Sequence, residues 1–354
     1  MSKRTNLQNF LASLPDFVFE YIEMYYTGES VNTQLGYSID LRIFLEFLIK
    51  FKFKDLKSPE DIEISHIQKV SASDIMRFKA YLKEYESEYI SADGKKIKCV
   101  RKNSAFGINR KLSAVRGLFS YLYKTDRISE NVTDKVDMNK LYQKIKKPLT
   151  SQEVMRLIDV LYNGEKYYEG RELSEYKRKK QRDIAIFIAY LGTGVRVSEL
   201  VNLDISDICF DTSSFIVTRK GGDQQEIFMP VQVENELCLY LEQRLKEEDA
   251  KDEKALFLSR QGKRMSVSSV EKMLKKYCHT VGIDDPDKSR PHALRRTFAC
   301  RLLEDGVDIK MVAELMGHKN IDVTHRFYAQ YNDRARKEIM RNLNISEAQG
   351  SSSK

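Results

Sequence analysis

The sequence predicts a mostly helical fold with one small β-sheet, divided into an N-terminal helical domain and a C-terminal α+β domain. Three observations support this prediction. Apolar residues recur at helical spacing through most of residues 1–145. Residues 215–231 resemble two strands joined at Gly221 and Gly222. The length of 354 residues is more than a single core usually fills.

In the N-terminal domain we expect four helices, with apolar faces within residues 10–22, 41–48, 75–82 and 108–122. Ser73 is placed to cap the third of these helices. Residues that repeat every three or four positions share one side of a helix, so we expect these apolar side chains to form the core rather than a ligand site.

Positive charge gathers in the same domain. Residues 1–148 contain 26 Lys and Arg against 19 Asp and Glu, which is most of the net charge of +8. Such a surface attracts a polyanion, although a solubilising surface explains the charge equally well. The candidate DNA contacts on the fourth helix are Arg110, Lys111 and Arg116. A second candidate is a lysine-rich loop at residues 87–103 that turns at Asp93 and Gly94.

A domain boundary is expected at residues 140–149, which form a short basic linker. Thr150 and Glu153 make a capping box at the start of the helix that follows. Lys146 and Lys147 in the linker are candidate contacts to a phosphate backbone. The expected divisions of the chain are a helical domain, an α+β domain and a disordered tail, at residues 1–145, 149–345 and 346–354.

In the C-terminal domain, residues 183–194 predict a helix that ends in a glycine turn, and the two strands follow it. From Ser268 onward the pattern is helical again. Residues 162–183 are polar and highly charged, so we expect a surface insertion there.

The composition excludes several classes of protein. The five cysteines are scattered without a CxxC pair, which favours a reduced, cytoplasmic protein without a zinc site. No stretch approaches the roughly 20 apolar residues that cross a bilayer, so no membrane association is expected. The N-terminus also lacks the apolar core of a secretory signal.

Two groups of basic residues carry the functional signal. Arg196 follows a glycine turn and opens a helix that also contains Glu199, where free backbone N–H groups favour an anion. His292 and Arg295 are three residues apart and therefore share a helical face. An arginine offers phosphate oxygens a planar, permanently charged fork. Arg296 competes as the second arginine, but it points about 100° away on the helix.

Three further residues complete the pattern. Lys220 lies at the tip of the predicted hairpin, His318 follows a glycine, and Tyr328 comes ten residues later. Each of these residues alone is more often structural or solvent-exposed than functional. Their order and spacing together indicate cleavage of a DNA strand without a metal or other cofactor, because basic side chains can hold a phosphate that a tyrosine attacks.

Together these motifs resemble the tyrosine recombinase, or phage integrase, family. The matching segments are TGVRVSEL, VTRKGG, PHALRRTFA, LMGHKN and the tyrosine segment, with NRKLSAVRGLFSYLYK in the N-terminal half. The resemblance covers about residues 20–335 and, within the family, favours the single-protein Xer recombinases of streptococci and lactococci. It implies a helical core-binding domain and a catalytic domain that clamp double-stranded DNA.

The resemblance also implies the reaction. Tyr328 attacks the scissile phosphodiester and forms a 3′-phosphotyrosine, leaving a 5′-hydroxyl. Arg196 and Arg295 clamp the non-bridging oxygens, and Lys220 protonates the departing 5′-oxygen. The covalent bond conserves the energy of the broken strand, so neither ATP nor metal is needed.

The remaining residues have supporting roles in this resemblance. His292 assists as an acid or base toward the tyrosine, His318 hydrogen-bonds the phosphate, and Glu199 positions members of the set. The family acts as a homotetramer on two DNA sites. Residues 335–345 are the candidate helix that docks on a neighbouring subunit.

Two alternatives stay open at this point. In many family members the nucleophile lies nine residues after the histidine, which here is Phe327, whereas others place it ten residues after, at Tyr328. We favour Tyr328 and chromosome-dimer resolution of the Xer type. An integrase or invertase of a mobile element would use the same residues. If Phe327 occupies the nucleophile position, the protein is a non-catalytic DNA-binding regulator.

Overall fold

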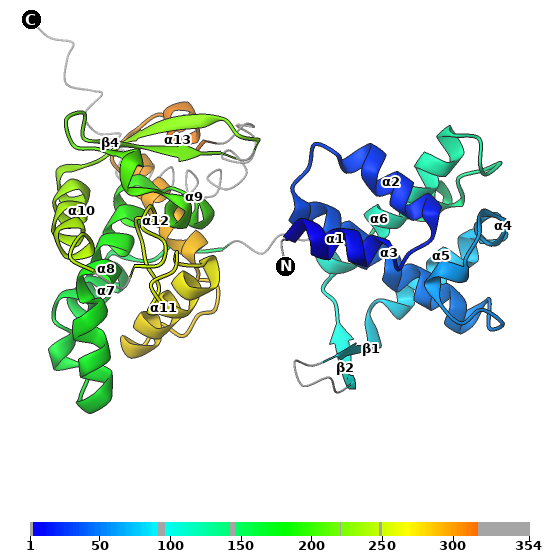
Figure 1. Cartoon of the computed structure of the whole chain (residues 1–354), viewed down its shortest axis with the longest axis horizontal. Coiled ribbons are helices and arrows are strands. Elements are labelled where there is room, and N and C mark those ends of the chain that lie inside the picture. The colour runs from blue at the N-terminus through cyan, green and yellow to red at the C-terminus, as the bar shows by residue number, and fades with distance from the viewer. Residues whose placement is uncertain (1–2, 91–95, 142–145, 220, 248–249, 318–354) are drawn as a thin grey trace, which may run out of the picture. The chain divides into compact units, whose positions relative to one another are not determined.

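A computed structural model of the chain describes residues 3–90, 96–141, 146–219, 221–247 and 250–317. The chain forms two compact units, Met1–Gln143 and Lys144–Lys354 (Figure 1). Both units are mainly helical and each contains a small antiparallel sheet, which confirms the predicted fold class. Within the described ranges, no helix is long and apolar enough to span a bilayer.

The first unit is a helical body built around two long helices. Its helices are α1 (Lys3–Leu11), α2 (Asp16–Tyr26), α3 (Val31–Phe51), α4 (Ile64–Ile67), α5 (Ala72–Tyr81) and α6 (Ala105–Lys124). Helix α3 packs against α1, α2 and α6. Phe44 and Leu48 of α3 and Phe119 of α6 are buried in the resulting core, as their helical spacing predicts.

Two predictions at helix ends were wrong in detail. The apolar face at residues 10–22 belongs to two helices, because Pro15 lacks an N–H and keeps the residue before it out of the helical conformation. Helix α5 is capped by Ser71 rather than Ser73. The Ser71 hydroxyl accepts a hydrogen bond from the N–H of Asp74, and the Asp74 carboxylate accepts one from the N–H of Ser71.

The loop predicted at residues 87–103 is a β-hairpin instead. Its strands are β1 (Glu84–Ile90) and β2 (Lys96–Lys102), and Figure 1 shows the ribbon extending from the helices of its unit. An acidic strand pairs with a basic one, and Lys102 forms an ion pair with Glu84 at 3.2 Å. Such cross-strand charge pairs favour this register. The predicted turn at Asp93 and Gly94 lies outside the described residues.

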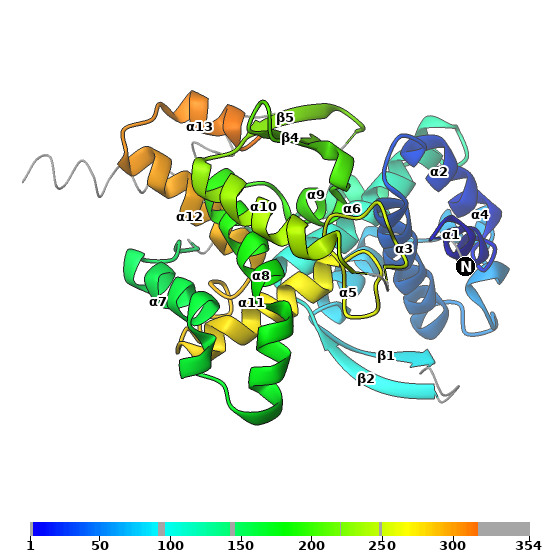
Figure 2. The same cartoon turned by 60° about the vertical axis from the view of Figure 1, so that its left-hand side comes forward.

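The second unit surrounds a long central helix with further helices and a small sheet. Its elements are α7 (Ser151–Tyr162), α8 (Gly170–Thr193), α9 (Val197–Asn202), β3 (Ile208–Cys209), β4 (Ser214–Thr218), β5 (Gln224–Phe228), α10 (Val231–Arg244), α11 (Val267–Thr280), α12 (Pro291–Glu304) and α13 (Ile309–Leu315). The strands form an antiparallel sheet in the order β3-β4-β5. Helix α8 packs against α7, α10 and α12, and Figure 2 shows it at the centre of the unit.

The predicted surface insertion at residues 162–183 is in fact part of the packed structure. Helix α8 starts at Gly170, so most of the segment is helical. Tyr168 and Tyr176 are buried, and the Tyr176 hydroxyl donates to the carbonyl of Leu161 at 2.9 Å. The two aromatic rings keep this segment in the packed structure despite its many charged residues. Each ring buries a large apolar area, while the charged groups remain in water.

Candidate active site

Helices α8, α9, α12 and α13 and strand β4 contribute residues to one end of the second unit. Helix α8 is capped at its C-terminus by Gly194, which has a left-handed φ of 61°. A Cβ atom on Gly194 would lie 2.2 Å from the Phe298 ring of α12. Glycine therefore allows the chain to turn tightly from α8 into α9 while α12 stays close.

Glu199 organises this end of the unit. It lies in the first turn of α9 and is buried. Its carboxylate accepts hydrogen bonds from the Arg196 backbone N–H and from Arg196 Nη1, each at 2.8 Å. It also accepts two from Arg219 Nη1, at 2.8 and 3.0 Å. One carboxylate thus orients two guanidinium groups.

The ionisation of Glu199 follows from these contacts. Burial alone would raise the pKa of its carboxyl. Hydrogen bonds from the Arg196 side chain and backbone, followed by the charge of Arg219, outweigh burial and hold the pKa below its ordinary value. Glu199 is therefore an anion at neutral pH and keeps its ion pair with Arg196.

Arg219 is a site residue that the sequence analysis missed. It directly follows β4 and is buried, and its Nε donates to Gln225 Oε1 at 2.8 Å. Among the described residues, its Nη2 is buried without a hydrogen-bond partner. The signal was present in the strand period, because Phe215, Val217 and Arg219 alternate with exposed residues and face the interior.

Two arginines from different helices converge on consecutive carbonyl groups. Arg196 Nη2 donates to the carbonyl of Gly317 at 3.0 Å, and Arg295 Nη2 donates to that of Met316. Gly317 has a φ of 59°, and a Cβ atom there would lie 2.5 Å from Arg219 Cζ. The chain leaving α13 is therefore held against three arginines just before His318.

The two converging arginines differ in exposure. Arg295 is buried and also donates to the carbonyl of Gly194. The side chain of Arg196 is 33% exposed, so a ligand can reach it. His292 lies on the same helix as Arg295. The residue is exposed to solvent overall, but partial desolvation of its ring lowers its pKa. The charges of Arg295 and Arg296 lower that pKa further, which favours the neutral imidazole.

Arg296 has a different partner from Arg295, as their separation of about 100° predicts. It is buried, and its Nη1 donates to the carbonyl of Lys147 at 2.6 Å. The neighbouring Thr297 hydroxyl accepts a hydrogen bond from the N–H of Leu149. Helix α12 therefore holds the C-terminal end of the linker at Lys147 and Leu149. Lys146 stays exposed in an ion pair of 3.3 Å with Asp287.

The three candidate cations of α6 make internal contacts. Arg110 is exposed and forms an ion pair with the buried Asp40 at 2.6 Å. Lys111 is buried, with its ammonium 3.9 Å from an oxygen of the same carboxylate. Arg116 donates to the carbonyls of Thr133 and Val136. For all three, contact with DNA stays a prediction, and it requires these side chains to share or exchange an internal partner.

The remaining predicted residues lie outside the described part of the chain. They are Lys220, His318, Phe327 and Tyr328, together with residues 335–345. Within the described ranges, no three His, Cys, Asp or Glu side chains gather closely enough to hold a metal ion. The described site is therefore a set of oriented arginines with one neutral imidazole, which suits an anion with several oxygens.

The sequence profile of the phage integrase family matches residues 147–334. Tyrosine recombinase XerC of Caldanaerobacter subterraneus subsp. tengcongensis is 31% identical over 98% of this chain and 92% of that protein. Tyrosine recombinase XerS of Streptococcus thermophilus is 30% identical over 92% of this chain and 95% of that protein.

Two solved structures have the same fold. One is the Tn1549 transposon integrase in complex with a circular intermediate DNA. The match covers 92% of this chain and 98% of the integrase chain, with 22% identity and a TM-score of 0.64. The XerH recombinase in a post-cleavage complex with a palindromic difH substrate covers 95% of this chain and 93% of its own. Its identity is 17% and its TM-score is 0.60.

Proposed function

The chain belongs to the phage integrase family, and we propose that it is a Xer-type site-specific recombinase that cuts and rejoins DNA through a 3′-phosphotyrosine. The observation that carries this proposal is the convergence of Arg196 and Arg295 on the carbonyls of Gly317 and Met316. Two permanently charged forks at one point can hold the oxygens of a single phosphodiester.

The two arginines would do this in different ways. Arg196 is oriented by Glu199 and remains partly exposed, so its guanidinium can meet a non-bridging oxygen while Glu199 holds it in place. Arg295 is buried, and its charge acts through a medium of low polarity. Phosphoryl transfer depends mainly on such positioning and charge stabilisation.

In the proposed reaction the Tyr328 oxygen forms a bond to phosphorus, and the bond from phosphorus to the 5′-oxygen breaks. The departing oxygen keeps the electron pair and takes a proton from Lys220. His292, held neutral by its surroundings, accepts the proton of the tyrosine. His318 would hydrogen-bond the phosphate. Attack by a 5′-hydroxyl of the partner duplex reverses these steps and reseals the strand.

The partners of the chain follow from this proposal. Double-stranded recombination sites are the substrate, and four copies of the chain would assemble on two such sites. Lys146 and Lys147 in the linker would contact the phosphate backbone, as would Arg110, Lys111 and Arg116 of the first unit. Residues 335–345 would dock on a neighbouring copy.

The proposal is tested with a nicked DNA site that traps the covalent intermediate. We expect the wild-type protein to form a protein–DNA adduct, and Tyr328→Phe to bind the site without forming one. A persistent adduct in this variant would refute Tyr328 as the nucleophile. An inert wild type whose activity appears in Phe327→Tyr would support the regulator alternative.

The Xer subtype is tested by the DNA site itself. Selection of genomic fragments by adduct formation should recover one chromosomal palindrome for an enzyme that resolves chromosome dimers. Recovery of the ends of a mobile element would assign the chain to the integrase or invertase alternative.

A further inference from the structure

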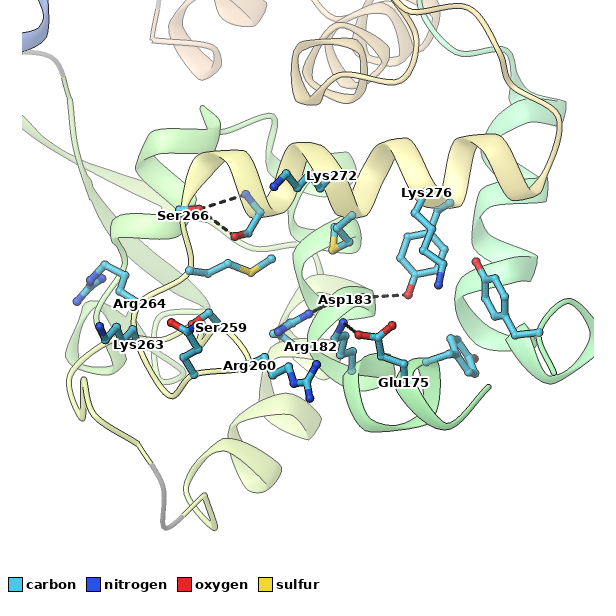
Figure 3. Close-up of a pocket in the computed structure, with 18 residues that line it drawn as sticks. Glu175, Arg182, Asp183, Ser259, Arg260, Lys263, Arg264, Ser266, Lys272 and Lys276 are labelled. Atoms are coloured by element: carbon cyan, nitrogen blue, oxygen red, sulfur yellow. Dashed lines mark hydrogen bonds and ion pairs between the residues drawn. The ribbon is translucent and has the colours of Figure 1, made fainter. Parts of the chain in front are cut away.

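The second unit contains a cavity of about 610 Å³ that the proposed reaction does not use. It lies between α8, the loop at residues 259–264 and α11 (Figure 3). Arg182 of its wall is about 18 Å along α8 from Gly194, at 1.5 Å per helical residue. The cavity is therefore separate from the candidate active site.

The lining of this cavity is strongly basic. Seven lining side chains are Lys or Arg, and two are carboxylates. The two carboxylates are already engaged, because Lys179 pairs with Glu175 at 2.7 Å and Arg182 with Asp183 at 2.6 Å. Most of the positive charge is thus left without a neutralising group on the cavity wall.

Three of the cations are available to a ligand. In the part of the chain that the structure describes, Arg260, Lys263 and Lys272 form no ion pair, and all three are exposed. Figure 3 shows Arg260 and Lys263 on the loop and Lys272 on α11, so they come from two sides. Like charges placed this way repel one another unless an anion lies between them.

A second hollow of about 460 Å³ continues the first. The two share Lys179, Arg182, Ser259 and Arg260, and the second adds Arg178 and Lys246 together with the carboxylate of Glu247. The cations that line the two hollows, here called the basic track, therefore form one continuous set that meets at Arg182 and Arg260. A ligand that neutralises the whole track needs negative charges spaced along its length.

We propose that this basic track binds the phosphodiester backbone of DNA outside the segment held at the active site. The inference rests on the proposed recombinase function, which supplies DNA as the ligand. A backbone with one charge per nucleotide matches an elongated row of cations better than a single phosphate group does. The paired Arg182 would act as a fixed contact, and the unpaired side chains would follow the strand.

The test begins with a triple variant of the basic track. Arg260→Gln, Lys263→Gln and Lys272→Gln together remove the three cations that form no ion pair. Affinity is measured against salt concentration on two DNA molecules. One is a short duplex with the recombination site alone, and the other is the same site with long flanks.

A charge-matched control variant changes the same unit away from the track. Lys166→Gln, Arg301→Gln and Lys310→Gln remove three exposed charges that line neither hollow. The net charge of the control therefore equals that of the track variant, so any difference in DNA affinity depends on where the charges lie.

We expect the track variant to lose about two to three units of the salt slope on the flanked duplex, since each neutralised phosphate contributes about 0.9. Its slope on the short duplex, and the slopes of the control variant, should match wild type. Equal slopes for all three proteins on the flanked duplex would overturn the proposal.

Two further measurements show whether the track binds DNA or a small ligand, and keep this result apart from the recombinase function. The track variant should form the covalent adduct on the short site at the wild-type rate. A wild-type protein that forms no adduct would refute the recombinase function. The salt slopes of DNA affinity would still show whether the basic track binds DNA. If a nucleoside triphosphate stabilises wild type but not the track variant against heating, and the slopes are equal, the cavity is a small-ligand site and the proposal is wrong.

Discussion

In the first unit, buried Asp40 lies beside Arg110 and Lys111, and in the second unit, buried Glu199 lies between Arg196 and Arg219. Both are carboxylates shared by two cations. Burial raises the pKa of Asp40 to about 6 despite the charges of Arg110 and Lys111, whereas the pKa of Glu199 is lowered.

The difference comes from hydrogen bonds rather than from the number of charges. Asp40 Oδ1 accepts one from Arg110 Nη2 at 2.9 Å, but within the described ranges Oδ2 has no hydrogen-bond partner, although Arg110 Nη1 lies 2.6 Å away. Both oxygens of Glu199 accept well-formed hydrogen bonds, including one from a backbone N–H. A nearby charge without good geometry does not compensate for desolvation.

The first prediction compares two arginines of the candidate active site with Arg110, the arginine beside Asp40. Arg196→Ala and Arg295→Ala should each slow cleavage on the order of 10²-fold or more, because in the proposed reaction the two arginines stabilise charge that develops in the transition state. Arg110→Ala should weaken site binding and leave the cleavage rate of bound DNA unchanged. Single-turnover cleavage and equilibrium binding on the same DNA site measure the two effects.

A modified substrate sharpens this first test. A 5′-phosphorothiolate substrate has sulfur in place of the bridging 5′-oxygen, and the 5′-thiolate departs without a proton. This substrate should restore cleavage to Lys220→Ala and leave Arg196→Ala slow. Rescue of both variants, or of neither, would mean that Lys220 is not the general acid. Equal losses of binding and cleavage in Arg196→Ala would reduce this arginine to an ordinary backbone contact.

The second prediction compares the carboxylates directly. Glu199→Gln replaces charge-assisted hydrogen bonds worth about 1.5–3 kcal/mol, so cleavage should slow roughly ten- to hundredfold with little change in site binding. Asp40→Asn should leave the cleavage rate of bound DNA within about twofold of wild type, because its partners lie in the first unit, outside the candidate active site. If both variants lose cleavage equally, Glu199 is not a specific positioning residue.

The third prediction concerns Arg219, the second cation of Glu199. Arg219→Met keeps an apolar stem in the interior and should slow cleavage less than Glu199→Gln, by roughly three- to tenfold, because Arg196 retains its own bonds to the carboxylate. Site binding should not change. A cleavage loss as large as that of Arg196→Ala would place Arg219 in contact with the phosphate instead of behind it.

The fourth and smallest effect is on stability. Folded Asp40 has a pKa of about 6, above its ordinary value near 4, so protonation favours the folded state. Its contribution is present below about pH 4 and is lost as the pH rises through about 6, a change on the order of 1–3 kcal/mol. Chemical unfolding between these pH values should show a slope that Asp40→Asn removes. An unchanged slope would contradict the raised pKa.

Local features of the second unit were predictable from the sequence. The capping box of Thr150 and Glu153 is present, with hydrogen bonds of 2.7 and 3.2 Å in the two directions. Arg196 and Glu199 are likewise three residues apart and pair within one helical turn. Such contacts depend on the geometry of a few adjacent residues, which the sequence specifies directly.

Contacts between distant residues were not predictable in the same way. Arg219 joins Glu199 across 20 residues of sequence, and Arg110 joins Asp40 across 70. A surface cation and a buried one have the same sequence signature when they lie beside an apolar stripe. Lys111 therefore counted as a surface charge, although it is 7% exposed.

The helical class and the glycine turn after α8 could be predicted from residue order alone, because periodicity and short-range hydrogen bonding are local. Arg196 and Arg295 were chosen as candidate phosphate ligands from the order of the motifs and their resemblance to the family. Three outcomes required the folded structure: which cations face inward, which carboxylate is fully hydrogen-bonded, and the basic cavity between α8 and α11. Those outcomes depend on how separate elements pack, since burial and hydrogen-bond geometry are set by the whole fold rather than by neighbouring residues.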